Sequence, residues 1–265
     1  MKVHDWRVFS QSDKFGAFWV LILCALAAIA AWRIGGVVRV AAQAKTKVNP
    51  NDGLTYVWIP PGTFQMGCSP DDAECQNFEK PAHSVKITKG FWIGQTQVTQ
   101  AAYQKVVGAN PSNFRGDRLP VEEVSWDDAQ GYCKGLQMRL PTEAEYEYAA
   151  RGGNPAARYA PLVGIAWYGA NSGETTHEVG QKQANGYGLY DTLGNVWEWV
   201  ADWSGAYDAA AAVDPQGPPI PPNGTLRVLR GGSWDLVASV VRVSYRGWIG
   251  PQARGSNIGF RCAGN

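Results

Sequence analysis

The sequence predicts an α+β fold with much irregular structure. Twelve Trp, 31 Gly and 16 Pro occur among its 265 residues, a composition typical of a compact domain with many turns and large aromatic anchors. Runs that alternate like strands and capped helical runs both occur along the chain. Because the length suffices for one large domain or two small ones, a sizeable core is expected.

The charge balance excludes one class of partner. The formal net charge is +1 and the sequence pI is about 7.6. Such a chain has no global field that would recruit nucleic acid or a charged membrane surface. We therefore expect no nucleic-acid partner.

The N-terminal part is separate from the remainder. Residues 1–14 are polar, and residues 15–32 form an uncharged run that is long enough to cross a bilayer as a helix. We expect a transmembrane anchor there; the alternative is a signal peptide cleaved near Ala42-Gln43-Ala44. Basic residues flank both sides of the run, so its orientation stays open. Residues 33–53 are expected to form a linker, and residues 54–265 the main domain.

The cysteines indicate an oxidising compartment. Apart from Cys24 in the apolar run, the chain has four cysteines, which allow two disulfides in three pairings. We favour Cys68–Cys75 and Cys133–Cys262 over reduced, buried thiols. Neither a CxxC motif nor a Cys/His zinc spacing is present. The domain is therefore expected outside the cytoplasm, anchored to a membrane, or secreted if the N-terminal segment is cleaved.

The first elements of the domain read as strands. "YVWIPPGTFQMG" predicts a hairpin, two strands around a Pro-Pro-Gly turn. "HSVKITKGFWIGQTQVT" alternates as strands do and leads to Thr99. Thr99 is a suitable N-cap for a helix over Gln100–Val107, which Gly108 would end.

Two further helices have clear start signals. Ser125 with Asp128 predicts a helix that continues through Cys133. Thr142 with Glu145 forms a capping box in "RLPTEAEYEYAARGG", with Gly152-Gly153 as the stop.

Two other stretches are interpreted without a catalytic role. Glu143, Glu145 and Glu147 suggest paired catalytic carboxylates, but acids in a first helical turn are favoured by the helix dipole, and we assign them no catalysis. Residues 205–224 are rich in Ala, Pro and Gly and predict a long loop.

Five ordered segments resemble one family. "GTFQMG", "RLPTEAEYEYAARGG", "YGLYDTLGNVWEWVADW", "RVLRGGSW" and "NIGFRC" are similar, in this order, to the formylglycine-generating enzyme (sulfatase-modifying factor) domain, over residues 54–263. The resemblance implies that family's variant of the C-type lectin fold. It also implies the Cys133–Cys262 pairing.

The family's copper site is altered in this sequence. Its oxidases hold copper with two cysteines shortly after the GGS motif and oxidise a substrate cysteine to formylglycine. The corresponding positions hold Leu236 and Val241, and neither side chain offers the soft thiolate that Cu(I) requires. The resemblance therefore implies no copper, and we expect no catalytic residues by the known mechanism.

A calcium site is retained in the pattern. In "DTLGNVWEW" the family supplies a side-chain oxygen, two backbone carbonyls and a carboxylate, which correspond to Asp191, Gly194, Val196 and Glu198. Hard oxygen ligands at this spacing suit a structural Ca²⁺ ion. The alternative is a surface turn with two ordinary acids.

The stretch from Gly231 to Cys262 has an unusual pattern. Trp234, Tyr245 and several arginines form a frame, and the residues between them follow neither strand nor helix periodicity. Folds of this type also occur as variable proteins of diversity-generating retroelements. In those proteins, adenines of a template are mutated, so that its Asn codons become codons for many residue types.

Asn codons explain the residues between the frame positions. Eleven positions carry a residue reachable by changing the first two bases of an Asn codon, or Asn itself. Together with Trp248, which we expect to be exposed, they are the predicted ligand-binding residues: Asp235, Leu236, Val237, Val240, Gly247, Ile249, Gly250, Ala253, Gly255, Ser256 and Asn257. The alternative for Leu236, Val237, Val240 and Ile249 is that they are ordinary core.

These observations favour a membrane-anchored, non-catalytic binding protein with a diversified surface at residues 235–257. Its ligand would be macromolecular, a protein or a cell-surface molecule. Two alternatives stay open. One is a sulfatase-modifying enzyme or accessory with altered chemistry, and the other is an envelope component with one fixed partner.

Overall fold

The computed structural model describes residues 44–219 and 225–265. The polar N-terminal segment, the apolar run 15–32 and most of the expected linker lie outside these residues. Within the described ranges, no helix has the length and apolar character that a membrane crossing needs.

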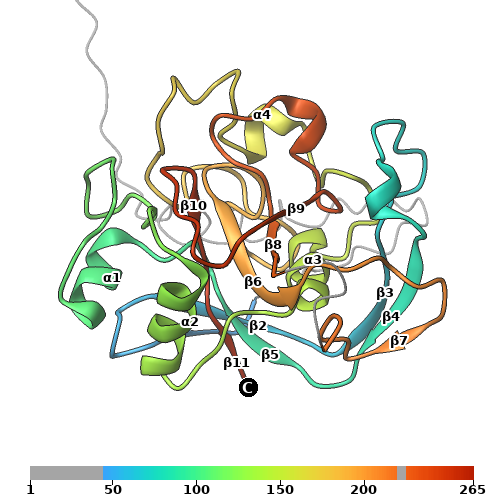
Figure 1. Cartoon of the computed structure of the whole chain (residues 1–265), viewed down its shortest axis with the longest axis horizontal. Helices are drawn as coiled ribbons and strands as arrows, with labels where there is room; N and C mark the ends of the chain where they lie inside the picture. The colour runs from blue at the N-terminus through green and yellow to red at the C-terminus, as the bar shows by residue number, and fades with distance from the viewer. Residues whose placement is uncertain (1–43, 220–224) are drawn as a thin grey trace, which may run out of the picture. The chain divides into compact units, whose positions relative to one another are not determined.

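Three small sheets and several short helices make up the domain (Figure 1), which confirms the α+β class with much irregular structure. In order across each sheet, the strands are as follows. The first sheet has β1 (Thr46–Val48), β2 (Thr55–Ile59), β5 (Phe91–Gly94) and β11 (Ala263–Gly264). The second has β10 (Ile258–Gly259), β6 (Trp197–Trp203), β8 (Arg227–Arg230) and β9 (Arg246–Ile249). The third has β3 (Gly62–Met66), β4 (His83–Ile87) and β7 (Ala212–Val213).

The helices begin and end where the capping signals predict. They are α1 (Gln100–Val107), α2 (Trp126–Gly135), α3 (Glu143–Arg151) and the short α4 (Leu162–Ile165), with 3₁₀ turns η1 (Asn77–Glu79) and η2 (Ala238–Val240). Thr99, Ser125 and Thr142 each accept a backbone N–H at the start of their helix. Gly108 and Gly152 end α1 and α3 in the left-handed conformation.

The predicted hairpin over residues 55–66 is wrong. Both strands form, but β2 pairs with β5 and β3 pairs with β4, in different sheets. The physical reason lies in Pro60 and Pro61, which have no N–H to donate and are not part of either ladder. The chain does not reverse there, and residues 55–66 pair instead with residues 83–94.

The linker also ends earlier than expected. Strand β1 lies inside residues 33–53 and pairs antiparallel with β2. All three of its residues are exposed, so hydropathy gives no sign of the strand. The backbone pairing of an edge strand places these residues in the domain.

Residues 205–219 are mostly irregular, as predicted, but the two residues of β7 pair in parallel with β4. This pairing fixes the described part of the loop on the third sheet.

Both favoured disulfides are present. Cys133–Cys262 links α2 to the segment before β11, and both cysteines are fully buried beside Tyr132, Leu140 and Phe260. Cys68–Cys75 closes a short loop ahead of η1. The long-range bond holds the end of the variable stretch in the core.

Candidate ligand-binding surface

None of the twelve predicted ligand-binding residues is buried. Val237, Trp248 and Ile249 are 68%, 41% and 37% exposed, and Asp235 is exposed as well. The other eight are half-buried. Three of the seven large apolar side chains that are exposed in the described residues lie in this one stretch.

In the frame, Trp234 and Tyr245 are half-buried and Arg254 is exposed, whereas a larger set of residues is buried. The set comprises Ser233, Val241, Arg242, Val243, Ser244, Arg246, Ile258, Phe260 and Arg261. The interpretation of Val237 and Ile249 as core is therefore wrong. Leu236 and Val240 are intermediate, because they pack against the edge of a core cluster without being enclosed by it.

Three arginines hold the frame by buried ion pairs, one of which joins Arg261 to Glu198. Arg242 lies 2.6–2.8 Å from both carboxylate oxygens of Glu79, and Arg246 binds Glu143 at 2.6 and 2.7 Å. Burial raises the pKa of Glu79, but Arg242, Ser244 and the N–H of Gln76 together outweigh it, and the net shift of this pKa is downward. Each pair fixes a point of the variable stretch on another part of the fold.

The two ends of the stretch meet. Asn257 donates to the carboxylate of Asp235 at 3.0 Å, and the indole N–H of Trp234 donates to the carbonyl of Ser256 at 3.1 Å. Positions 22 residues apart in the sequence therefore form one surface.

The middle of the stretch is on β9, which lies at the edge of its sheet (Figure 1). Trp248 packs edge-on against Phe78, with ring centroids 5.2 Å apart, and Phe78 also contacts Tyr245. Sequence reasoning did not find Phe78. The disulfide Cys68–Cys75 just before it could have indicated Phe78, because a loop closed by a disulfide can hold a neighbouring side chain in a fixed position.

Glycines at variable positions and glycines at frame positions differ in whether a side chain could replace them. At the variable positions Gly247 and Gly250, an added Cβ would meet atoms no closer than 3.4 Å, or none within 4 Å, and neither backbone is left-handed. At the frame position Gly231, φ is +93°, and at Gly259 a Cβ would lie 2.4 Å from the carbonyl oxygen of Val121. The frame requires its glycines, and the variable positions do not.

Comparison with known proteins decides the family. The model of the family described as "Sulfatase-modifying factor enzyme 1-like domain" matches residues 41–265. The chain belongs to this family. Its fold is accordingly the formylglycine-generating-enzyme type of C-type lectin fold.

Three relatives of this sulfatase-modifying-factor domain are informative. The formylglycine-generating enzyme of Streptomyces coelicolor is 31% identical, over 84% of this chain and 93% of that protein. The serine/threonine-protein kinase pkn1 of Chlamydia caviae is 44% identical over 86% of this chain, but this covers 41% of the kinase. The solved structure of Treponema denticola variable protein 1 has a TM-score of 0.74 at 33% identity, over 84% of this chain and 99% of that one.

The positions of the family's copper cysteines are apolar here. Val241 is fully buried, and Leu236 packs against the same core cluster. The four cysteines of the domain are all in disulfides. Within residues 44–219 and 225–265, no group of three or more His, Cys, Asp or Glu residues is placed to hold a metal ion.

The predicted calcium ligands do come together, but around a side chain. The carbonyl oxygens of Gly194 and Val196 and one carboxylate oxygen of Glu198 lie 3.3, 3.0 and 3.1 Å from the amide nitrogen of Gln97. Asp191 contributes its backbone carbonyl, at 3.2 Å, while its carboxylate accepts the N–H of Gly180. The amide nitrogen of Gln97 therefore lies among the oxygens that the resemblance assigns to calcium.

Asp191 itself is an unusual acid. Burial, followed by the smaller effect of nearby Glu198, raises its pKa to about 6, although the N–H of Gly180 and Arg261 act in the opposite direction. No sequence signal pointed to Gln97, which is 94 residues from Asp191 and separated from it by the helices α1 to α4.

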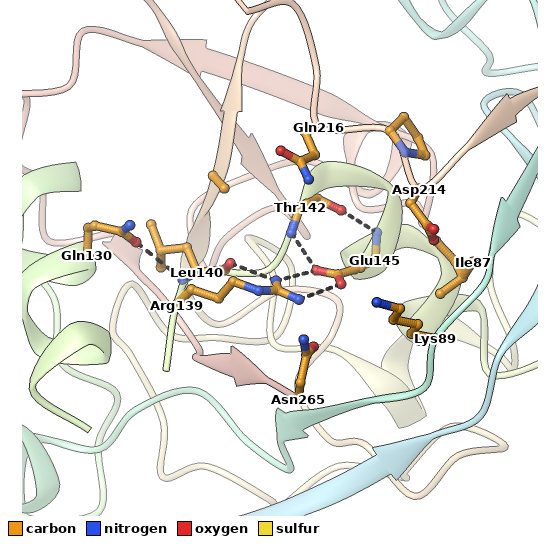
Figure 2. Close-up of a pocket in the computed structure, with 12 residues that line it drawn as sticks. Ile87, Lys89, Gln130, Arg139, Leu140, Thr142, Glu145, Asp214, Gln216 and Asn265 are labelled. Atoms are coloured by element: carbon orange, nitrogen blue, oxygen red, sulfur yellow. Dashed lines mark hydrogen bonds and ion pairs between the residues drawn. The ribbon is translucent and has the colours of Figure 1, made fainter. Parts of the chain in front are cut away.

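A polar cavity of about 450 Å³ lies at the start of α3 (Figure 2). Arg139 reaches into it and makes two bonds of 2.6 and 2.7 Å to Glu145, whose carboxylate also accepts the N–H of Thr142. None of the twelve predicted ligand-binding residues lines this cavity. Arg139 and Glu145 in it bond to each other and serve the helix start.

Proposed function

We propose that this protein is a non-catalytic ligand-binding protein whose C-terminal surface, residues 235–257, is diversified by a retroelement. One observation carries the proposal. The positions compatible with template Asn codons are all at least partly exposed, whereas residues 241–244 and Arg246, which lie between them, are buried.

The scaffold is suited to variation. Substitution of exposed side chains away from caps and ion pairs usually changes stability little. The buried arginines and the Cys133–Cys262 disulfide hold the backbone independently of the variable side chains. The likeness to Treponema denticola variable protein 1 over 99% of that chain supports this use of the fold.

The ligand is proposed to be a macromolecule. Val237, Trp248 and Ile249 expose apolar surface together with the polar pair Asp235–Asn257. Exposed apolar groups with a polar surround are typical of protein–protein contacts. The two disulfides support an extracytoplasmic location, and residues 15–32 are proposed to anchor the chain in the membrane.

The test is the DNA on both sides of the gene, together with the gene from several isolates. We expect an imperfect copy of the 3′ end with Asn codons at the eleven positions, and a reverse transcriptase gene nearby. Isolates should differ at those positions and agree at the codons of Arg242, Arg246 and Arg261. Identical residues at 235–257 in every isolate, with no such copy, would instead favour the fixed-partner alternative.

A second function is favoured by a specific observation, the 31% identity to a formylglycine-generating enzyme over 93% of its length. Its test is incubation of the protein with copper and a cysteine-containing peptide in air. Aldehyde formed on the peptide would establish the enzyme and overturn the non-catalytic proposal. A variant with Leu236 and Val241 both changed to Cys serves as a comparison for restored copper binding.

A further inference from the structure

Several oxygen atoms converge on the side-chain amide of Gln97 in the interior of the domain. Gln97 is fully buried, and its amide nitrogen faces four oxygens at 3.0–3.3 Å, namely the backbone carbonyls of Asp191, Gly194 and Val196 and one oxygen of Glu198. An amide group has two hydrogens and cannot serve four acceptors equally. The question is therefore which of the four oxygens depend on it.

Two of the oxygens have other donors. Arg261 donates to the carbonyl of Asp191 at 3.0 Å and to the same Glu198 oxygen at 2.7 Å. The hydroxyl of Tyr146 also lies 3.2 Å from that oxygen. These two acceptors are therefore satisfied without Gln97.

The other two oxygens depend on Gln97. Among the described residues, no further donor reaches the carbonyls of Gly194 and Val196. Two N–H groups thus face two carbonyls that lack any other donor. The two N–H groups of Gln97 are thus used in full without an ion, while its own carbonyl oxygen is buried with no hydrogen-bond partner among the described residues.

The negative charge of Glu198 is also neutralised within the protein. Glu198 forms a two-bond pair with Arg261, at 2.6 and 2.7 Å, and both side chains are fully buried. A divalent cation among the same oxygens would lie beside a guanidinium group that already neutralises this carboxylate. At short range in a buried site, that repulsion is large.

We propose that the amide of Gln97 takes the place of a structural cation in this protein, so that its fold does not depend on calcium. The side chain at position 97 then decides the metal requirement. An ionised carboxylate there would face two carbonyls with no hydrogen to offer, and a cation would then join the oxygens.

The experiment measures thermal unfolding of the full-length chain in EDTA and in about 5 mM calcium, with metal content by mass spectrometry. We expect the wild type to unfold at the same temperature in both solutions and to carry no calcium. Gln97→Glu should unfold about 5–10 °C lower in EDTA, and calcium should restore about half or more of that loss.

Gln100→Glu is the matched control. Gln100 is another buried glutamine whose amide donates to two backbone carbonyls, those of Phe114 and Pro120. No group of converging oxygens that includes a carboxylate surrounds it, so the variant should be destabilised with no recovery in calcium.

Three results would overturn the proposal. The first is a wild type that loses stability in EDTA or gains it in calcium, and the second is about one calcium ion per purified chain. Both would establish the calcium site that the sequence predicts. The third is a Gln97→Glu variant that calcium does not restore, because the oxygens would then not be a site whose cation Gln97 replaces.

Discussion

At the scale of single residues, glycines distinguish the frame from the variable surface. Gly247, Gly250 and Gly255 stand at positions where template Asn is expected, and none has a left-handed backbone. A Cβ at Gly255 would lie 2.9 Å from the end of the Asn257 side chain, which can move, and at ordinary contact distance from Ile258. Gly259, in contrast, is buried in β10, and its surroundings leave no room for a Cβ atom.

The first prediction concerns these glycines. Gly247→Asn, Gly250→Asn and Gly255→Asn should each change the free energy of unfolding by less than about 1 kcal/mol. Gly259→Ala should cost about 1–3 kcal/mol, because its Cβ would lie 2.4 Å from the carbonyl oxygen of Val121. Urea unfolding measures all four. Large losses in the three Asn variants would show that the variable positions belong to the frame.

At the scale of elements, β9 is held to α3 by charge as well as by its sheet. Arg246 and Glu143 are almost fully buried, and the guanidinium binds both carboxylate oxygens. Burial raises the pKa of Glu143, but Arg246 and Arg230 together bring it below its ordinary value. The sequence interpretation of Glu143 as a helix-dipole residue was therefore incomplete: its partner lies 103 residues away.

The second prediction tests this link. Arg246→Met should destabilise the protein by about 3–5 kcal/mol, because it leaves a buried carboxylate without its main partner. Combined with Glu143→Gln, the loss should be smaller than the sum of the two single losses. Arg118→Met is the control, since Arg118 and Glu178 form an exposed pair, and it should change stability by less than about 1 kcal/mol. Additive losses would contradict the coupling.

At the scale of the whole molecule, the interior contains acids that are not balanced by arginines. Asp202 is buried and accepts the N–H of Glu143 at the start of α3. Burial, and after it the charge of Glu143, raises its pKa to about 8, against smaller opposing effects of the Glu143 N–H and Arg246. Asp191 is raised to about 6 by burial.

The third prediction is a pH dependence. Below about pH 4, Asp202 is protonated in both the folded and the unfolded chain. As pH rises from there towards 8, the unfolded chain loses the proton and the folded chain retains it, so stability should fall across this window. Asp202→Asn retains an acceptor for the Glu143 N–H and removes the titration. Melting temperatures at pH 5 and 8.5 should therefore differ less in the variant, and an equal difference would contradict the assignment.

The sequence by itself determined the features that depend on neighbours along the chain. The caps at Thr99, Ser125 and Thr142 act within three residues of their partners, so their helices were predicted to within a residue or two. The five motifs determined the family and the fold. The spacing of template-compatible residues also predicted a set of positions that are all at least partly exposed in the structure.

Only the tertiary structure decided what depends on distant partners. Pro60 and Pro61 looked like a turn, yet β2 and β3 each pair with a strand from residues 83–94. The calcium ligands were placed together as expected, but Gln97 enters between them from a segment about 100 residues away. Hydrogen bonds and ion pairs of this kind join groups that the chain brings close only when it folds. No local pattern encodes them.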